Sequence, residues 1–271
     1  MCEGAPQRTL ENNFDPPVRI NHGGGHIFLG VIDMNDSRLI SALDFHNEKD
    51  AKNLVETLGD AVGFYKVGME LFYSVGPDIV RWLKARDKKI FLDLKLHDIP
   101  NTVAEGLCSL LALGADMLNI HASGGFTMMK TAADKLKLRA EELGVERPKL
   151  IAVTVLTSIN ENDWDELGYQ TNVTNQVVRL ARLSLKAGLD GVVASPREAK
   201  AIRQACGEDF LIVTPGIRPA GASIDDQCRI ETPASALKNG ANYLVIGRPI
   251  RAAADPKAAA QSIVEEMNAV E

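Results

Sequence analysis

The sequence lacks any pair of cysteines spaced like a zinc site or a redox motif. Its four cysteines, Cys2, Cys108, Cys206 and Cys228, lie far apart in the chain. This usage is typical of free thiols in a reducing compartment, so we expect a cytoplasmic protein without a disulfide framework. The chain also lacks an apolar run long enough to cross a membrane, and we expect no membrane partner.

An excess of positive charge is missing as well. Lysine and arginine number 30 against 36 aspartates and glutamates, which gives a formal net charge of −6. The affinity of general nucleic-acid binders depends on clustered lysine and arginine side chains, so this composition argues against a nucleic-acid partner. Hydrophobic residues make up 45% and charged residues 24% of the chain, as in ordinary soluble globular proteins.

Residues 1 to 33 show little of the periodicity found in the rest of the chain. Pro16-Pro17 and a run of glycines, 23 to 25, interrupt them, and their one apolar patch is too short for a secretory signal. We therefore expect an N-terminal extension without regular structure over 1–33, with Met34 as a candidate start of the folded domain. The expected domain covers residues 34–271.

From Arg38 onward, short apolar runs alternate with segments of helical spacing, which predicts eight strand–helix units. The predicted strands are Leu39 to Leu43, Gly63 to Val67, Ile90 to Leu94, Met117 to Ile120, Leu150 to Leu156, Gly191 to Val193, Leu211 to Val213 and Tyr243 to Ile246. Glycines at 114, 188 and 240 predict helix ends, because glycine accepts the left-handed backbone found there. Thr102 and Glu105 predict a capping box at one helix start. Eight such units favour a single (β/α)8 TIM barrel of the α/β class. The alternative is a doubly wound sheet, but this sequence lacks the Gly-x-Gly-x-x-Gly turn of a dinucleotide site after its first predicted strand.

The densest group of ionisable residues lies between Asp93 and Thr102, in the order Asp-Leu-Lys-Leu-His-Asp-Ile-Pro-Asn-Thr. Side chains alternate along a strand, so Asp93 and Lys95 are expected on the same face, with Asp98 just beyond the strand end. Three charged groups within six residues are costly to desolvate unless they pair or react. A structural ion pair is the simpler explanation, but the added Asp98 favours a catalytic site.

Polar residues also follow the other predicted strands, at the ends where a barrel carries its chemistry. In chain order these are Asp44, Lys66, Asp93 with Lys95, His121, Thr157, Ser195, Gly216-Ile217-Arg218 and Gly247-Arg248. The last two groups follow strands seven and eight, where barrels commonly bind phosphate. Glycine admits an anion close to the backbone, and arginine offers a charged, planar fork. Residues 219 to 227 have no regular period and predict a mobile loop, with Gln227 able to reach a phosphate on closure.

With these residues, the chain resembles the bacterial type of the orotidine 5′-phosphate decarboxylase family from about Arg38 to Val270. The specific matches are Asp93-x-Lys95-x-x-Asp98-Ile99-Pro100-x-Thr102, Lys66 in Tyr-Lys-Val-Gly, and the two arginine-bearing loops. The resemblance implies a cofactor-free barrel that converts orotidine monophosphate to uridine monophosphate in pyrimidine synthesis.

The resemblance also implies a role for each matching residue. Lys95 corresponds to the proton donor, and Lys66, Asp93 and Asp98 complete a charged catalytic network. The implied substrate-binding residues are Asp44 and Lys66 for the ribose, Thr157 for the pyrimidine, and Gln227, Gly247, Arg248 and Arg218 for the phosphate. Asp98 and Thr102, with Ile99 between them, are implied to reach the partner's site in a homodimer.

Other activities remain open on the residues alone. Related barrels that decarboxylate or condense phosphosugars share Asp-x-Lys-x-x-Asp and bind Mg²⁺ through another acid on strand two, where this chain has Lys66. Isolated histidines such as His46, His97 and His121 are weak candidates for metal ligands. A Schiff-base aldolase that uses Lys66 or Lys95, and a non-catalytic phosphate binder, are further alternatives.

Overall fold

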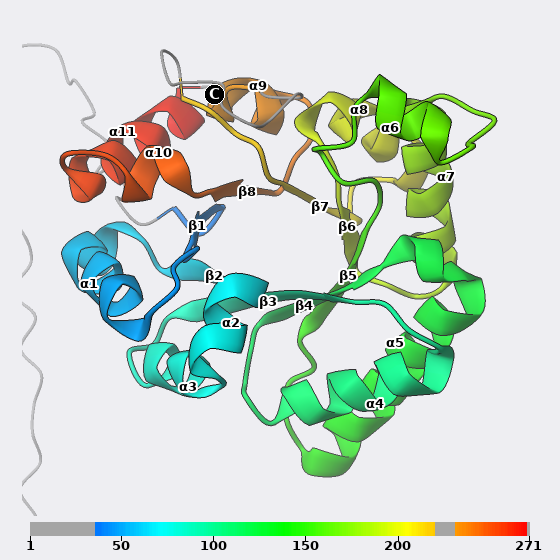
Figure 1. Ribbon diagram of the computed structural model, residues 1–271, viewed down its shortest axis with the longest axis horizontal. Helices are drawn as coiled ribbons and strands as arrows, with labels where there is room; N and C mark the ends of the chain where they lie inside the picture. The colour runs from blue at the N-terminus through cyan, green and yellow to red at the C-terminus, as the bar shows by residue number, and fades with distance from the viewer. Residues whose placement is uncertain (1–35, 220–230, 270–271) are drawn as a thin grey trace, which may run out of the picture. The chain divides into compact units, whose positions relative to one another are not determined.

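The computed structural model describes residues 36–219 and 231–269, and within these ranges eight parallel strands form a closed barrel (Figure 1). Each strand pairs with the next in chain order, and β8 closes the barrel against β1. The strands are β1 (Leu39–Ala42), β2 (Phe64–Gly68), β3 (Lys89–Leu96), β4 (Met117–His121), β5 (Lys149–Val153), β6 (Gly191–Val193), β7 (Leu211–Thr214) and β8 (Tyr243–Ile246). The predicted (β/α)8 barrel and its eight strands are confirmed. The main differences in bounds are that β3 runs on to Leu96 and that β5 ends at Val153, before the predicted Leu156.

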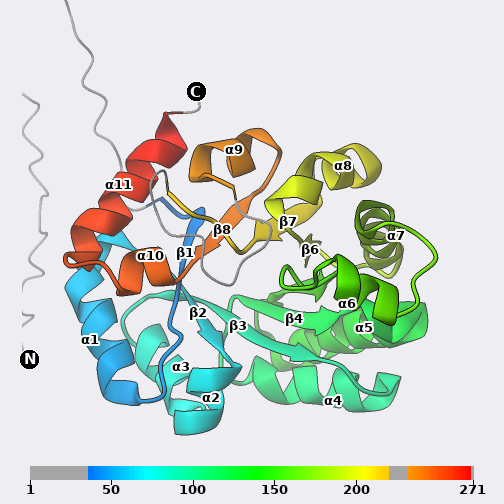
Figure 2. The ribbon, with the colours of Figure 1, turned by 45° about the horizontal axis from the view of Figure 1, so that its top comes forward.

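Helices connect the strands and lie outside the ring of strands in both views (Figure 1 and Figure 2). A parallel neighbour can only be reached by a crossover, and a helix supplies that crossover while covering the apolar outer face of the sheet. The helices are α1 (Glu48–Leu58), η1 (Gly59–Ala61), α2 (Met69–Val75), α3 (Asp78–Lys84), α4 (Pro100–Leu111), η2 (Ala122–Gly124), α5 (Gly125–Leu143), α6 (Glu161–Glu166), α7 (Val173–Lys186), α8 (Pro196–Cys206), α9 (Pro233–Lys238), α10 (Arg248–Arg251) and α11 (Pro256–Asn268).

The alternation of side chains along each strand separates two apolar clusters. A large cluster fills the space between strands and helices, and a smaller one fills the barrel interior. The interior cluster consists of Ile40, Ala42, Phe64, Phe91, Met117, Ile151, Val213 and Val245. The same alternation continues toward the carboxyl ends of the strands. There, polar side chains occupy the interior face, next to the interior apolar cluster.

One predicted helix start is wrong. Helix α4 begins at Pro100, with Ile99 as its N-cap and no capping hydrogen bond from a side chain, so Thr102 and Glu105 do not form the predicted capping box. Proline at the first helical position needs no N–H partner and has a backbone angle suited to a helix, and it starts α4 before Thr102. The predicted glycine stops are confirmed, because Gly114, Gly188 and Gly240 have φ of 71°, 86° and 99°.

The same anchoring contact recurs before three of the even-numbered strands. Asp190, just ahead of β6, accepts a hydrogen bond from the Leu150 backbone N at 2.7 Å and pairs with the Arg147 guanidinium at 2.7 and 2.8 Å. Equivalent contacts join Asp116 to Ile90 N and Lys84, and Asn242 to Ile212 N and Arg203. Each anchor thereby ties the start of one strand to the strand before it.

Several predicted features concern residues that the structure does not describe. The expected extension over residues 1 to 33, Gln227 and two of the cysteines lie outside the described residues, so those expectations stay predictions. Cys108 and Cys206, the two cysteines within the described ranges, are free. Among the helices of residues 36–219 and 231–269, none combines the length and hydropathy needed to span a membrane.

Candidate active site

A cavity of about 260 Å³ opens at the carboxyl ends of the strands. Most of the residues predicted for the site line it: Asp44, Lys66, Asp93, Lys95, Thr157, Arg218, Gly247 and Arg248. They come from the ends of six different strands, so only closure of the barrel brings them together. The rest of the lining is largely apolar, with Ala42, Phe91, Val153, Val193 and Val245 among its members.

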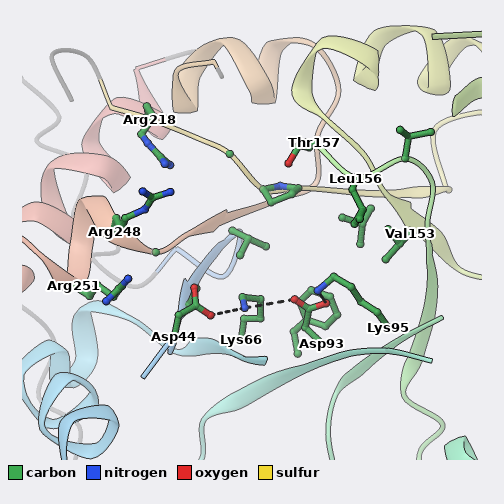
Figure 3. Close-up of a pocket in the computed structure, with 18 residues that line it drawn as sticks. Asp44, Lys66, Asp93, Lys95, Val153, Leu156, Thr157, Arg218, Arg248 and Arg251 are labelled. Atoms are coloured by element: carbon green, nitrogen blue, oxygen red, sulfur yellow. Dashed lines mark hydrogen bonds and ion pairs between the residues drawn. The ribbon is translucent and has the colours of Figure 1, made fainter. Parts of the chain in front are cut away.

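Four charged side chains of alternating sign form a row along one wall of the cavity (Figure 3). The Lys66 Nζ atom lies 2.8 Å from Asp44 Oδ1 and 3.5 Å from Asp93 Oδ2. The Lys95 Nζ atom in turn donates to Asp93 Oδ1 at 2.7 Å. Two ammonium groups and two carboxylates therefore lie in contact, each cation beside an anion.

Lys66 is the most enclosed cation of this row, with 12% of its side chain exposed. Burial opposes its charged form, but the carboxylates of Asp93 and Asp44 outweigh burial and raise the pKa of the ammonium above its ordinary value. A high pKa keeps Lys66 positive. Gly68 leaves room for it, because a Cβ at that position would lie 2.8 Å from the Lys66 Nζ atom.

Lys95 has an unusual backbone. Its φ is 53°, in the left-handed region that costs a residue with a side chain about 1–2 kcal/mol. The pairing of β3 with β4 shifts register here, from Leu92 opposite Leu118 to Leu96 opposite Ile120. Strand β3 therefore has more residues than β4 across this stretch, which is a bulge, and bulges re-aim side chains. The prediction that Asp93 and Lys95 share a face is consistent with their contact, but the contact is made within an irregular strand.

Arginines gather on the other side of the cavity from Lys95 (Figure 3). Arg218 follows β7 and is 7% exposed, and Arg248 begins the short helix α10 after β8. Arg251, which sequence reasoning missed, ends the same helix and also lines the cavity. The spacing of three residues from Arg248 is the signal that would have found it, since residues three apart share a helix face.

Of the residues that the family resemblance implies for the site, three within the described ranges do not line the cavity. Asp98, Ile99 and Thr102 lie at the start of α4 and are exposed, and 67% of Ile99 is accessible to solvent. The Asp98 side chain accepts a hydrogen bond from the Ile99 backbone N at 2.6 Å. Within one chain they are therefore separate from the charged row.

Asn119, in the middle of β4, is a second residue that the sequence did not reveal. It is 1% exposed, and its amide contacts both Asp93 and the backbone of Lys95. The only signal in the sequence is a polar residue inside the apolar run Met-Leu-Asn-Ile-His.

The histidines weighed as metal ligands do not form a ligand set. His97 and His121 lie beside each other, with ring centroids 5.2 Å apart, and His46 pairs with Glu70. Burial first, and then the neighbouring His97 and Lys95, lower the pKa of His121. Across residues 36–219 and 231–269, no three histidine, cysteine or acidic side chains are grouped to hold a metal ion.

Comparison with known proteins places this site in context. The sequence model of the "Orotidine 5′-phosphate decarboxylase / HUMPS family" matches residues 37–263. The chain is 51% identical to orotidine 5′-phosphate decarboxylase of Moorella thermoacetica over 234 residues, covering 86% of this chain and 93% of the relative. It is 52% identical to the enzyme of Trichlorobacter lovleyi over 231 residues, covering 85% and 95%. The crystal structure of orotidine 5′-phosphate decarboxylase from Lactobacillus acidophilus superimposes with a TM-score of 0.76 at 44% identity, covering 86% of this chain and all of that one. The chain therefore belongs to the orotidine 5′-phosphate decarboxylase / HUMPS family.

Proposed function

We propose that this enzyme decarboxylates orotidine 5′-monophosphate to uridine 5′-monophosphate, a step of de novo pyrimidine synthesis, without a metal or organic cofactor. One observation carries the proposal: an alternating row of ammonium and carboxylate groups faces a set of arginines within one cavity. The row suits a reaction that develops negative charge on carbon, and the arginines suit a phosphate.

The two sides of the cavity would bind different parts of the substrate. The phosphate would be held by Arg218, which follows β7, and by Arg248 and the backbone at Gly247, which follow β8. Asp44 and Lys66 would hold the ribose, and Thr157 the pyrimidine. Binding a phosphate far from the reacting carbon supplies free energy that can position the substrate in the transition state.

Lys95 carries the chemical step in this proposal. The bond from C6 of the pyrimidine to its carboxylate breaks, CO₂ leaves, and the electron pair stays on C6 in the plane of the ring. The Lys95 ammonium stabilises this charge and then donates a proton from Nζ to C6, which gives the product. Asp93 contacts Lys95 Nζ at 2.7 Å and would hold the ammonium toward the reacting carbon.

The contacts of Lys66 support a reaction without metal. An Mg²⁺ ion at this wall would need the carboxylates of Asp44 and Asp93, and the Lys66 ammonium contacts both. The raised pKa of Lys66 also argues against its use in a Schiff base, because that chemistry needs a neutral amine.

The test is a spectrophotometric assay with orotidine 5′-monophosphate, with and without EDTA. We expect equal turnover in both, and abolished turnover in Lys95→Ala with binding of uridine 5′-monophosphate retained. Loss of wild-type turnover in EDTA that Mg²⁺ restores would contradict the cofactor-free mechanism. Near-normal turnover in Lys95→Ala would remove Lys95 from it.

We further propose that the enzyme is a cytoplasmic homodimer in which Asp98, Ile99 and Thr102 complete the partner's site. All three residues are exposed, and Ile99 is a large apolar side chain. Their exposure supports the proposal that this surface contacts another chain. Free thiols at Cys108 and Cys206 are compatible with a reducing compartment.

A further inference from the structure

The side chain of Asn119 lies inside the barrel, in contact with Asp93 of the charged row. Along β4 it shares the interior face with Met117, a member of the interior cluster, whereas Leu118 and Ile120 pack on the outer side. Only 1% of Asn119 is exposed. A buried amide has to find its hydrogen-bond partners within the protein, so the identity of those partners shows what it is there for.

Both of its partners belong to the bulge of β3. Asn119 Oδ1 accepts a hydrogen bond from the Lys95 backbone N at 2.8 Å, and Asn119 Nδ2 donates to Asp93 Oδ1 at 2.7 Å. That same Asp93 oxygen accepts from Lys95 Nζ. Asn119, Asp93 and Lys95 thus form a closed ring of contacts that joins the backbone of Lys95 to its own ammonium.

The ring helps to hold Lys95 in its left-handed backbone conformation. In the bulge, the ladder between β3 and β4 is interrupted between Leu92 and Leu96, so the Lys95 N–H has no regular place in it. The Asn119 oxygen provides the acceptor that the ladder does not. A side chain that only accepts or only donates could satisfy one of the two partners, whereas an amide satisfies both.

We propose that Asn119 is a positioning residue, which holds Asp93 and the strained Lys95 in the geometry that the proton donor needs. The inference rests on the proposed decarboxylase function. Asn119 does not line the cavity, so it acts through its two neighbours and not on the substrate.

The experiment compares Asn119→Asp and Asn119→Ala with the wild type in turnover of orotidine 5′-monophosphate and in binding of uridine 5′-monophosphate. The aspartate keeps the acceptor for Lys95 N but replaces the donor to Asp93 with a second carboxylate. We expect kcat to fall on the order of 100-fold in both variants, because small displacements of catalytic groups have effects of this size. Binding of the product should change far less, since the arginines are untouched.

A pH profile separates positioning from a general loss of stability. Two adjacent carboxylates retain a proton to higher pH than one alone, and a protonated carboxyl at position 119 could again donate to Asp93. The Lys66 and Lys95 ammoniums beside Asp93, and the neighbouring His121, are the same in both enzymes, so the added carboxylate is the difference between their pH profiles. The kcat of Asn119→Asp relative to wild type should therefore rise as pH is lowered from about 8 to about 5. Ser184→Ala is the control: Ser184 is equally buried and hydrogen-bonded, but lies in α7 away from the site, so its loss should leave kcat unchanged at every pH.

The outcomes distinguish this inference from the proposed function. If the wild type does not decarboxylate the substrate, the proposed function fails. If the wild type is active and both Asn119 variants keep its kcat, or if the pH profile of Asn119→Asp stays parallel to that of the wild type, the positioning role is overturned alone. Should Asn119→Asp not fold, as judged by its melting curve, the kcat of Asn119→Ala against that of Ser184→Ala decides the question.

Discussion

Lys95 combines a proposed catalytic ammonium with a backbone conformation that side chains disfavour, and the two can be separated experimentally. Lys95→Gly and Lys95→Ala both remove the ammonium, but only glycine accepts a φ of 53° without strain. We expect both variants to be inactive, and the glycine variant to be more stable by about 1 kcal/mol. This reverses the usual order within a strand, where glycine is the weaker residue. Urea unfolding of the two variants measures the difference, and a more stable alanine variant would contradict the strain at Lys95.

Arg248 allows a test of the phosphate side of the cavity. Arg248→Ala should raise KM strongly, and lower kcat as well if phosphate contacts position the substrate in the transition state. Arg179→Ala removes the same charge from the exposed face of α7, outside the cavity, and should leave both constants unchanged. Steady-state kinetics of both variants check this, and equal kinetics in the two would exclude Arg248 from substrate binding.

At the scale of residues, the sequence predicted side chains whose chemistry stands out and missed those whose role depends on a neighbour. Asp93 and Lys95 are an opposite-charge pair at strand spacing, and the arginines follow glycines at the expected loops. Asn119 is a single amide in an apolar strand, and nothing within β4 shows that it faces a bulge in β3. Its role becomes visible only when the two strands are paired.

At the scale of elements, the anchors before β4, β6 and β8 should contribute to stability independently of catalysis. Asp190→Ala leaves the Leu150 N–H without its acceptor and Arg147 without its carboxylate partner, which we expect to cost about 2–3 kcal/mol. Asp134→Ala breaks only an exposed ion pair within α5 and should have almost no effect. Chemical denaturation of both variants measures the difference. The kcat of the folded Asp190→Ala enzyme should remain that of the wild type, and a large loss of kcat would instead connect this anchor to the site.

The order of the elements could be predicted because apolar runs of strand length alternate with segments of helical spacing from Arg38 onward. Their ends were less certain, for local reasons. Pro100 starts α4 before the capping pair that the sequence suggested, and β3 continues through its bulge to Leu96. A bulge is set by pairing between strands, so the single-strand alternation used for the prediction could not reveal it.

At the scale of the whole molecule, one chain leaves its proposed catalytic set divided. Lys95 lines the cavity, whereas Asp98, three residues later, is exposed at the start of α4. In the proposed two-fold dimer, each cavity would combine Lys95 of one chain with Asp98 of the other. If each cavity uses residues of both chains, two different inactive variants can complement each other in a mixed dimer. Sites built within a single chain cannot do this.

Lys95→Ala and Asp98→Ala should each be inactive alone and recover activity when their subunits exchange. In a mixed dimer, the cavity of the Lys95→Ala chain lacks both groups, while the cavity of the Asp98→Ala chain keeps its own Lys95 and receives Asp98 from its partner. Random exchange makes about half of the dimers mixed, each with one intact site, so about a quarter of wild-type activity should return. Exchange is verified by mass spectrometry of differently tagged chains, and mixing two batches of the same variant is the control. If Lys95 and Asp98 served the same cavity, every mixed dimer would carry two damaged sites, and verified exchange would restore nothing.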